Sequence, residues 1–285
     1  MKKVFVLILN YNGKATLKKC LQSVYQLNYP DFEVVVIDND SKDGSLEEAK
    51  KEYSRAHYIK NDRNLGFAAG NNVGIRFALE KGADYVWLVN NDAKVERDTL
   101  TKLVEAGEQH PRSGILSPLI LHAETKNIWF GKGTIDWVKM RTIHVSPPTL
   151  MRSYSSDYIC GCAMLIKKDV FKSIGLLNEK YFLYYEDADF SVKAARAGFE
   201  LLVVPMANVL HAEASAENPD KTYWLVVSGL QFFQENAPSH YQLWHYAYFQ
   251  GRRVKNYIDC ASGKNPLAQE VARAYRDYVS TPKIV

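Results

Sequence analysis

The sequence predicts an α/β protein in which a mostly parallel sheet is flanked by helices on both faces. Short apolar runs alternate with helical patterns over the first half of the chain. The runs are apolar throughout instead of at every second position, which is typical of strands buried on both faces. Each run ends in Asn and Asp, residues that favour turns. These three observations together indicate a doubly wound fold.

The first half of the chain supplies the parallel part of the predicted sheet. Leu17, Val24 and either Cys20 or Leu21 share one helical face, and Thr16 is suited to be the N-cap of that helix. The predicted strands and helices alternate in the order strand 4–9, helix 16–25, strand 32–37, helix 45–54, strand 57–60, helix 71–81 and strand 85–89.

The second half of the chain is less regular. Helices are predicted over 168–174 and 187–197, because Gly175 and Gly198 follow them and glycine favours helix ends. Strands are predicted over 163–166 and 200–204, and a largely helical segment over 222–260. Residues 122–156 are mixed in composition and support no assignment.

The charge distribution separates a neutral body from a basic tail. The chain has 36 Lys and Arg against 32 Asp and Glu, a net charge of +4, and residues 241–285 hold seven basic and three acidic residues. A nucleic-acid binder would need a basic face, so we expect no nucleic-acid partner. The basic tail indicates contact with an anionic partner.

Cysteine usage and hydropathy indicate a cytoplasmic protein. The four cysteines are irregularly spaced, so we expect neither a disulfide framework nor a zinc site at Cys160 and Cys162. The start, MKKVFVLILNYNGK, is read as a strand because its apolar run is too short for a signal peptide. No apolar stretch approaches the ~20 residues of a membrane span.

Polar side chains cluster where the predicted strands of the first half end. Ligands of such sheets bind beyond the carboxyl ends of the strands. Turn formation explains any one cluster, but it explains less well why all four are rich in donors and acceptors. The clusters are Asn10-Tyr11-Asn12, Asp38-Asn39-Asp40-Ser41, Asn61-Asp62-Arg63-Asn64 and Asn90-Asn91-Asp92.

Several carboxylates are candidates for ligand binding. Asp38, at a strand tip, is suited to accept from a nucleobase or a ribose hydroxyl, whereas Asp40 and Asp43 are better explained by an Asx-turn and an N-cap. Asp92 is suited to hold a divalent cation bridging two phosphates, with a turn before the next helix as the alternative. The Gly-rich stretch 64–74 matches neither a dinucleotide fingerprint nor a P-loop.

Glu186, Asp187 and Asp189 place three carboxylates within four positions. Such crowding raises at least one pKa and favours acid–base chemistry, whereas an acidic helix start is the alternative. Both interpretations hold if Asp189 caps the helix while Asp187 faces a pocket. A single histidine such as His211 is more often structural than a ligand. The interpretation of His211 as a metal ligand becomes stronger if Asp92 binds a metal.

These residues form motifs that follow one another in a fixed order. In these motifs the chain resembles GT-A glycosyltransferases of family 2, and most of all the rhamnosyltransferase-like branch of that family. The resemblance covers about residues 3–215. The matching segments are VLILNYNG at 6–13, VVVIDNDSKDGS at 34–45, NLGFAAGNNVGI at 64–75, WLVNNDAKV at 87–95, GCAMLIKKDVFKSIGLLNEKYFLYYEDADFSVKAARAGFEL at 161–201 and VLHAEAS at 209–215.

The resemblance implies a GT-A catalytic domain over 1–215 and a helical C-terminal appendage over 216–285. Within the domain, about 1–110 would bind the nucleotide sugar, and 111–215 would supply the catalytic base and the acceptor site.

The resemblance also implies roles for individual residues. Asp187, beside Glu186, would be the general base of an inverting transfer to a hydroxyl of a glycan or lipid-linked acceptor. Asp92 and His211 would hold Mg²⁺ or Mn²⁺. The donor-binding residues would be Asn10, Asn12, Asp38, Asn64, Gly66, Asn72, Asn90 and Asn91.

One departure from the rhamnosyltransferase-like pattern leaves the donor open. That branch has an Arg-Asn pair in the helix after the histidine, where this chain reads TYWLVVSGLQFF. Uridine diphosphate sugars and thymidine diphosphate sugars are both compatible with the sequence as donors, and we favour dTDP-rhamnose.

Two other classes of function compete with this one. A sugar-nucleotidyltransferase would need a Gly-rich loop with Arg and Lys after the first strand, which Asn10-Tyr-Asn-Gly-Lys14 does not supply. Asp92, Asp187 and His211 argue against a non-catalytic binding module.

The C-terminal appendage combines aromatic residues with the basic segment Gly251-Arg-Arg-Val-Lys255. This combination suits peripheral contact with the inner face of a membrane. It equally suits packing of the aromatic residues on the catalytic domain or on a second subunit of a homodimer. The sequence pattern leaves both interpretations open.

Overall fold

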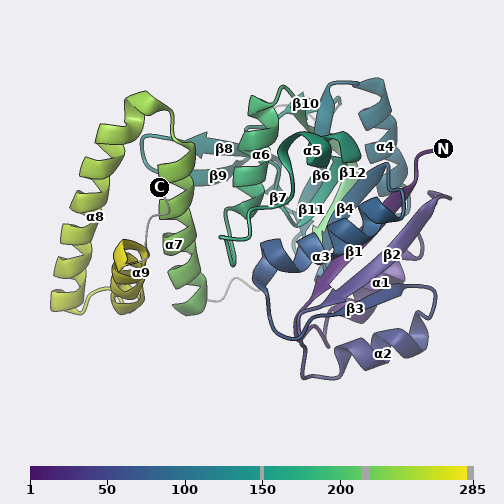
Figure 1. The fold of residues 1–285 in the computed structure, drawn as a ribbon, viewed down its shortest axis with the longest axis horizontal. Coiled ribbons are helices and arrows are strands. Elements are labelled where there is room, and N and C mark those ends of the chain that lie inside the picture. Colours follow the sequence, from purple (N-terminus) through teal and green to yellow (C-terminus); the bar gives the residue numbers. More distant parts are fainter. Residues whose placement is uncertain (148–150, 213–218, 281–285) are drawn as a thin grey trace.

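The computed structural model describes residues 1–147, 151–212 and 219–280. A central mixed sheet has helices on both faces, and three helices stand to one side of it (Figure 1). The main strand order is β10-β12-β6-β11-β4-β1-β2-β3, with β5 paired to β12 and β7 paired to β6. The predicted fold class is therefore confirmed.

The first half of the chain forms the parallel part of the sheet. Its strands are β1 (Val4–Asn10), β2 (Phe32–Asp38), β3 (His57–Lys60) and β4 (Tyr85–Asn90). The register pairs Asn10 with Asp38 and Leu9 with Asn90, so the polar ends of β1, β2 and β4 meet at one edge. The strands between these ends are almost entirely buried because both faces are covered.

The helices of this half are α1 (Leu17–Val24), α2 (Ser45–Glu52), α3 (Gly66–Glu80) and α4 (Thr99–Gln109). Thr16 precedes α1, but its hydroxyl donates to the Gly13 carbonyl and the expected side-chain cap is absent. The α3 helix begins before the predicted residue 71. Glycine lowers helix propensity. Close packing nevertheless requires glycine at position 74, since a Cβ on Gly74 would lie 2.6 Å from Ile37.

The second half adds the antiparallel β11 and extends the sheet. A strand predicted over 200–204 continues to His211 because β12 resumes its pairing with β6 after a register shift between Val204 and Asn208. The unassigned segment 122–156 contributes β7 to β10. The elements are β5 (Ala93–Val95), β6 (Ser113–His122), β7 (Ile128–Phe130), β8 (Lys132–Asp136), β9 (Arg141–Val145), β10 (Tyr154–Ser155), β11 (Ala163–Lys167), α5 (Lys168–Ile174), α6 (Glu186–Arg196) and β12 (Glu200–His211).

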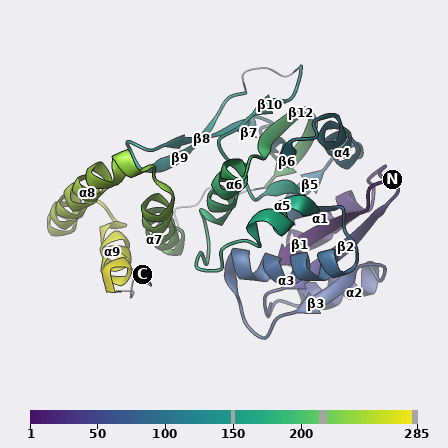
Figure 2. The same cartoon turned by 45° about the horizontal axis from the view of Figure 1, so that its top comes forward.

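The C-terminal part consists of α7 (Pro219–Asn236), the short 3₁₀ helix η1 (Ser239–Tyr241), α8 (Gln242–Ser262) and α9 (Ala268–Ser280). The β8–β9 hairpin reaches from the body of the protein toward these helices (Figures 1 and 2). Phe232 of α7 is fully buried and stacks on Trp137 of the hairpin, with ring centroids 5.8 Å apart. Within the described ranges, no helix has both the length and the hydropathy to cross a membrane.

A buried carboxylate ties α7 to α6. Asp189 has no solvent exposure, and it accepts hydrogen bonds from Lys193 Nζ at 2.6 Å and Asn236 Nδ2 at 2.8 Å. The expectation that Asp189 caps α6 is wrong, because its side chain points to α7 and makes no cap hydrogen bond. Asp189 therefore fixes the appendage to the helix that carries Asp187.

We predict that Asn236→Ala lowers the free energy of unfolding by about 1–3 kcal/mol, because it leaves a buried carboxylate with one partner fewer. Urea denaturation measures this change. Gln231→Ala on the same helix removes a solvent-exposed hydrogen bond to Glu235 and serves as the matched control. Equal stability of Asn236→Ala and the wild type would contradict the anchoring role.

Candidate active site

A cavity of about 400 Å³ lies near the polar end of β4. Five of the site residues predicted from the sequence line it together: Asn90, Asp92, Glu186, Asp187 and His211. Residues more than 110 positions apart in the chain thus share one site, because β12 brings His211 back to pair with Ala93 of β5.

The start of α6 directs the acidic pair into this cavity. Tyr184 and Tyr185 have φ angles of 68° and 67°, a left-handed conformation that is unfavourable for residues other than glycine. The sharp turn that they make places Glu186 and Asp187 in the first turn of α6. Gly161 donates its backbone N–H to Asp187 Oδ2 at 2.8 Å, which holds the carboxylate at the cavity wall.

The environment changes the protonation of both acids. Burial raises the pKa of Glu186 well above its usual value, and the neighbouring Asp187 raises it further. Burial also raises the pKa of Asp187, although hydrogen bonds from the N–H groups of Gly161 and Ala188 oppose this shift. Glu186 Oε2 is buried without a hydrogen-bond partner. Asp187 is therefore the better ionised acceptor for a proton, with Glu186 favouring the neutral form.

Asp92 and His211 fit a divalent cation. Asp92 Oδ1 lies 3.3 Å from His211 Nε2, but this approach is not aligned as a hydrogen bond. Asp92 Oδ1 and His211 Nδ1 are both buried without a hydrogen-bond partner. Over the described ranges, no group of three or more His, Cys, Asp or Glu is arranged to hold a metal. The protein would thus supply few ligands, as is common for Mg²⁺ bound with phosphate groups.

Asn10 connects the ends of three strands. Its Nδ2 donates to Asp38 Oδ1 at 2.8 Å and to Ser45 Oγ at 2.9 Å, and its Oδ1 accepts from Asn91 Nδ2 at 3.1 Å. Asp38 is fully buried, and its second oxygen accepts from the Ser41 N–H at 2.9 Å. Asp38 therefore orders the loop after β2, and a direct contact with a nucleotide stays a prediction.

Two other predicted donor residues lie in the same loops. Asn12 adopts a φ of 51°, and its Oδ1 accepts from the Lys42 N–H at 2.9 Å. Asn64 Oδ1 accepts from the Gly66 N–H at 2.9 Å and from Asn39 Nδ2 at 3.1 Å. Asn39, to which the sequence assigned no role, joins these loops because it follows Asp38 at the strand end.

Gly66 has to be glycine for two reasons. Its φ angle is 78°, and an added Cβ would lie 2.3 Å from the Phe182 carbonyl oxygen. Gly66 thus lets the start of α3 approach the segment that leads to α6.

Asn72 lies apart from the other predicted donor residues. It is fully buried, and its amide donates to the Leu177 carbonyl at 2.8 Å and to Glu179 Oε1 at 2.9 Å. Its Oδ1 accepts from the Leu177 N–H at 3.1 Å. Asn72 therefore holds the segment after α5, and a role in donor binding stays a prediction.

The cavity also has lining residues that no motif indicated. Trp129 of β7 packs edge-on against His211 with ring centroids 4.6 Å apart, and His144 of β9 and Tyr158 complete this wall. They come from the segment 122–156 and its continuation, where the sequence shows no clear periodicity. Cys160 and Cys162, neither of which forms a disulfide, also line the cavity.

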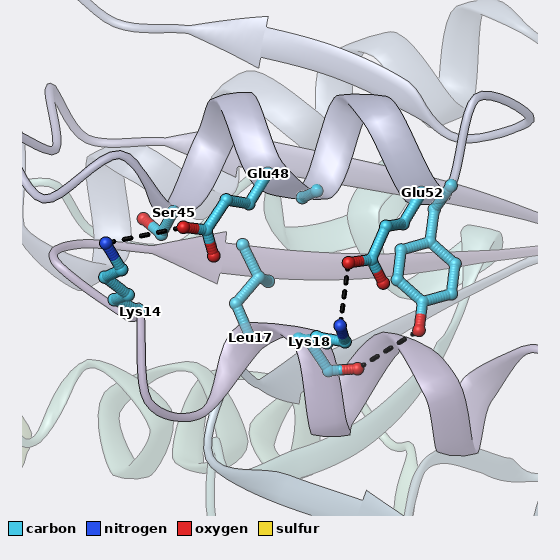
Figure 3. A pocket seen from close by; sticks show the side chains of 8 residues that line it. Lys14, Leu17, Lys18, Ser45, Glu48 and Glu52 are labelled. Carbon is cyan, nitrogen blue, oxygen red and sulfur yellow. Dashed lines mark hydrogen bonds and ion pairs between the residues drawn. The ribbon is translucent and has the colours of Figure 1, made fainter.

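A small hollow between α1 and α2 has no room for a ligand. Figure 3 shows Lys14 and Lys18 paired with Glu48 and Glu52, at 3.3 Å and 2.7 Å. The space that remains is about 10 Å³, close to the volume needed for one water molecule. We therefore place the functional site in the larger cavity.

An acidic pair and an Asp–His pair thus face one cavity near the polar edge of this mixed sheet. Residues 5–175 match the family model "Glycosyl transferase family 2". The chain belongs to this family, as the sequence resemblance predicted.

Characterised relatives include rhamnosyltransferases. The chain is 27% identical to the low-salt glycan biosynthesis hexosyltransferase Agl10 of Haloferax volcanii, over 72% of this chain and 66% of that protein. It is 24% identical to the dTDP-rhamnosyl transferase RfbF of Shigella flexneri, over 73% and 69%. It is 23% identical to the N-acetylglucosaminyl-diphospho-decaprenol L-rhamnosyltransferase of Mycobacterium tuberculosis, over 75% and 78%.

Solved structures share the fold. GalNAc-T7 with UDP, GalNAc and Mn²⁺ superposes with a TM-score of 0.67 and 20% identity, over 92% of this chain and 58% of that chain. The Pyrobaculum calidifontis mannosyltransferase PcManGT with GDP-Man and Mn²⁺ gives 0.64 and 18%, over 99% and 81%.

The raised pKa of Glu186 leads to a prediction about stability and pH. The folded state favours protonated Glu186, so its contribution is complete below the unfolded-state pKa near 4.5 and is lost as the pH rises toward the folded-state pKa. In Glu186→Gln the free energy of unfolding should therefore fall less as the pH rises above 4.5 than in the wild type.

Urea denaturation across this pH range measures the difference. Glu105→Gln, at an exposed position of α4, is the control. The same pH dependence in Glu186→Gln and the wild type would show that Glu186 does not titrate in this way.

Proposed function

We propose that the protein is an inverting, metal-dependent hexosyltransferase that uses a nucleoside-diphosphate sugar and acts in cell-surface polysaccharide synthesis. The observation that carries this proposal is the shared cavity, which joins the buried acid pair to the Asp92–His211 pair. We favour dTDP-rhamnose as the donor because the relatives include a dTDP-rhamnosyl transferase. Uridine diphosphate sugars are the second candidate.

The donor would bind over the polar strand ends of about residues 1–110. Asn10 and Asn91 share a hydrogen bond there, and Asn90 lies at the cavity. Asn12, Asp38, Asn64 and Gly66 would shape the loops around the nucleotide. Residues 111–215 would supply the base and the acceptor side, and 216–285 would form the appendage. We propose that the enzyme works in the cytoplasm at the inner face of the membrane.

The chain supplies the proton acceptor. The acceptor hydroxyl, from a glycan or lipid-linked saccharide, would donate its proton to Asp187, whose orientation is fixed by the Gly161 N–H. The deprotonated oxygen then attacks the anomeric carbon, and the bond to the diphosphate breaks on the opposite face. Asp92 and His211 would hold Mg²⁺ or Mn²⁺, which offsets the negative charge on the leaving diphosphate when bound.

We expect Asp187→Asn to reduce sugar transfer by about 10²–10⁴-fold, the usual contribution of a positioned general base. Donor affinity should stay nearly intact, because the amide keeps the shape of the side chain. Turnover is measured with dTDP-rhamnose and with uridine diphosphate sugars in the presence of Mn²⁺. Asp169→Asn, an exposed carboxylate that pairs with Lys172, is the matched control. Equal loss of transfer and donor affinity would reject the base assignment.

We expect Asp92→Ala to weaken donor binding and to abolish its dependence on Mn²⁺. Calorimetric titration of the donor with and without Mn²⁺ separates these effects from turnover. Asp98→Ala, which removes an exposed carboxylate paired with Lys102, should bind the donor as the wild type does. A Mn²⁺ effect of wild-type size in Asp92→Ala would reject the metal role.

A further inference from the structure

A second cavity, of about 290 Å³, adjoins the candidate active site. Tyr185 and Leu225 line both cavities, so the two lie side by side. Three cationic side chains line the second cavity, and among the described residues that line it there is no Asp or Glu. These three are Lys139, Arg141 and Arg252.

The cationic side chains are only weakly neutralised by the protein. Neither Lys139 nor Arg252 makes an ion pair within the described residues, and Arg141 approaches Asp136 at 3.5 Å. Tyr248 and Tyr275 line the cavity together with Arg252. Neutral tyrosine hydroxyls beside a guanidinium leave its charge in place. A cavity with such an excess of positive charge is suited to a phosphate group, which Arg binds through paired N–H donors.

The cations of this cavity come from two elements that are far apart in sequence, and α7 supplies much of the remaining wall. Lys139 and Arg141 come from the β8–β9 hairpin and Arg252 comes from α8, which face each other in Figures 1 and 2. Trp244 Nε1 of α8 donates to the Val138 carbonyl at 2.8 Å, directly before Lys139. The hairpin and the helix are therefore held together, and the charges lie on a fixed frame.

A third cavity, of about 550 Å³, continues from the second one. The two share four apolar residues, Met140, Leu230, Phe233 and Phe249. Ala237 and Val279 add to the apolar part of its wall, and the polar part comes from Gln234, Gln242, His245, Gln250 and Arg253. Tyr246 lines this cavity and is also 68% exposed. The apolar cavity thus extends to the outer side of α8.

The outer side of α8 exposes several large apolar side chains. Leu243, Val254 and Tyr257 are 87%, 61% and 76% exposed, and they recur at helical spacing with Tyr246. Such exposure of large apolar side chains indicates contact with an apolar partner.

We propose that the second cavity binds the phosphate or diphosphate group of a lipid-linked acceptor. This proposal rests on the function proposed above. The acceptor's chain would lie in the apolar cavity and its saccharide hydroxyl would reach Asp187. The order of the cavities, from acid pair to cations to apolar wall, matches the order of sugar, phosphate and lipid in such a molecule. A free anionic glycan would use the cations but would leave the apolar cavity empty.

Farnesyl diphosphate is a suitable probe for titration calorimetry with the full-length protein. The wild type should bind it, and added salt should weaken binding because salt screens the charges. Arg252→Ala and, independently, Arg141→Ala should each weaken binding by about tenfold, as expected for the loss of a charge-assisted hydrogen bond. Arg252→Lys should restore part of the affinity.

Lys255→Ala is the matched control, since it removes a cation of the same helix that pairs with Asp259 and lines neither cavity. It should bind farnesyl diphosphate as the wild type does. Thermal unfolding of each variant verifies that it is folded, and the two arginine variants lie on different elements.

Several outcomes would overturn the proposal. Wild-type affinity in both Arg252→Ala and Arg141→Ala would exclude the cationic cavity as the binding site. Binding of farnesol as tight as that of farnesyl diphosphate would exclude phosphate recognition. Equally tight binding of inorganic diphosphate would favour a free anion over a lipid.

A failure of the proposed glycosyltransferase function would give a different result from a failure of the phosphate-binding proposal. In that case the wild type would neither bind nor turn over any nucleotide sugar, which is measured without the farnesyl diphosphate probe.

Discussion

The hydrogen bonds of Asn10 hold together the ends of β1, β2 and β4. Its amide donates to Asp38 and Ser45, and its oxygen accepts from Asn91. In a parallel sheet these three ends are neighbours, so one buried side chain can fix the relative position of three loops. An added Cβ on Gly13 would lie 2.3 Å from Asn10 Oδ1, so the chain after β1 has to pass close to this amide. The segment that leads to Asp92 depends on this network for its position.

The acid pair is positioned by a different constraint. Two consecutive tyrosines in the left-handed conformation turn the chain into α6, and strain of this kind tends to persist where the surrounding structure demands it. The ring of Tyr185 packs against Phe232 of α7, with centroids 5.3 Å apart. The appendage therefore supports the turn that presents Asp187, and it is part of the architecture of the site.

The aromatic residues of the C-terminal part divide into two groups. Phe232 and Phe233 are buried against the β8–β9 hairpin and Tyr185. Tyr246 and Tyr257 are largely exposed on the outer side of α8. The inner group holds the hairpin and α7 together, and the outer group leaves an apolar surface beside the cationic cavity.

The sequence by itself determined the parallel half of the fold and the identity of the acidic and amide residues at the strand ends. Uniformly apolar runs and the Asn and Asp that end them are local signals, and the strand over 57–60 has the bounds predicted for it. The motif containing Asp187 was likewise readable, because its carboxylates are adjacent in the chain.

Only the tertiary structure decided which of these residues meet. His211 reaches Asp92 because β12 resumes pairing after its register shift, an event set by contacts with β6 and not by local propensity. Asn72 lies near the other amides in sequence, yet packing of α3 directs it to Leu177 and Glu179. The cations of the second cavity carry no motif, since Lys139 and Arg252 become neighbours only when the hairpin docks on α8. Long-range packing determines which of these residues become neighbours, and it leaves little signal in local composition.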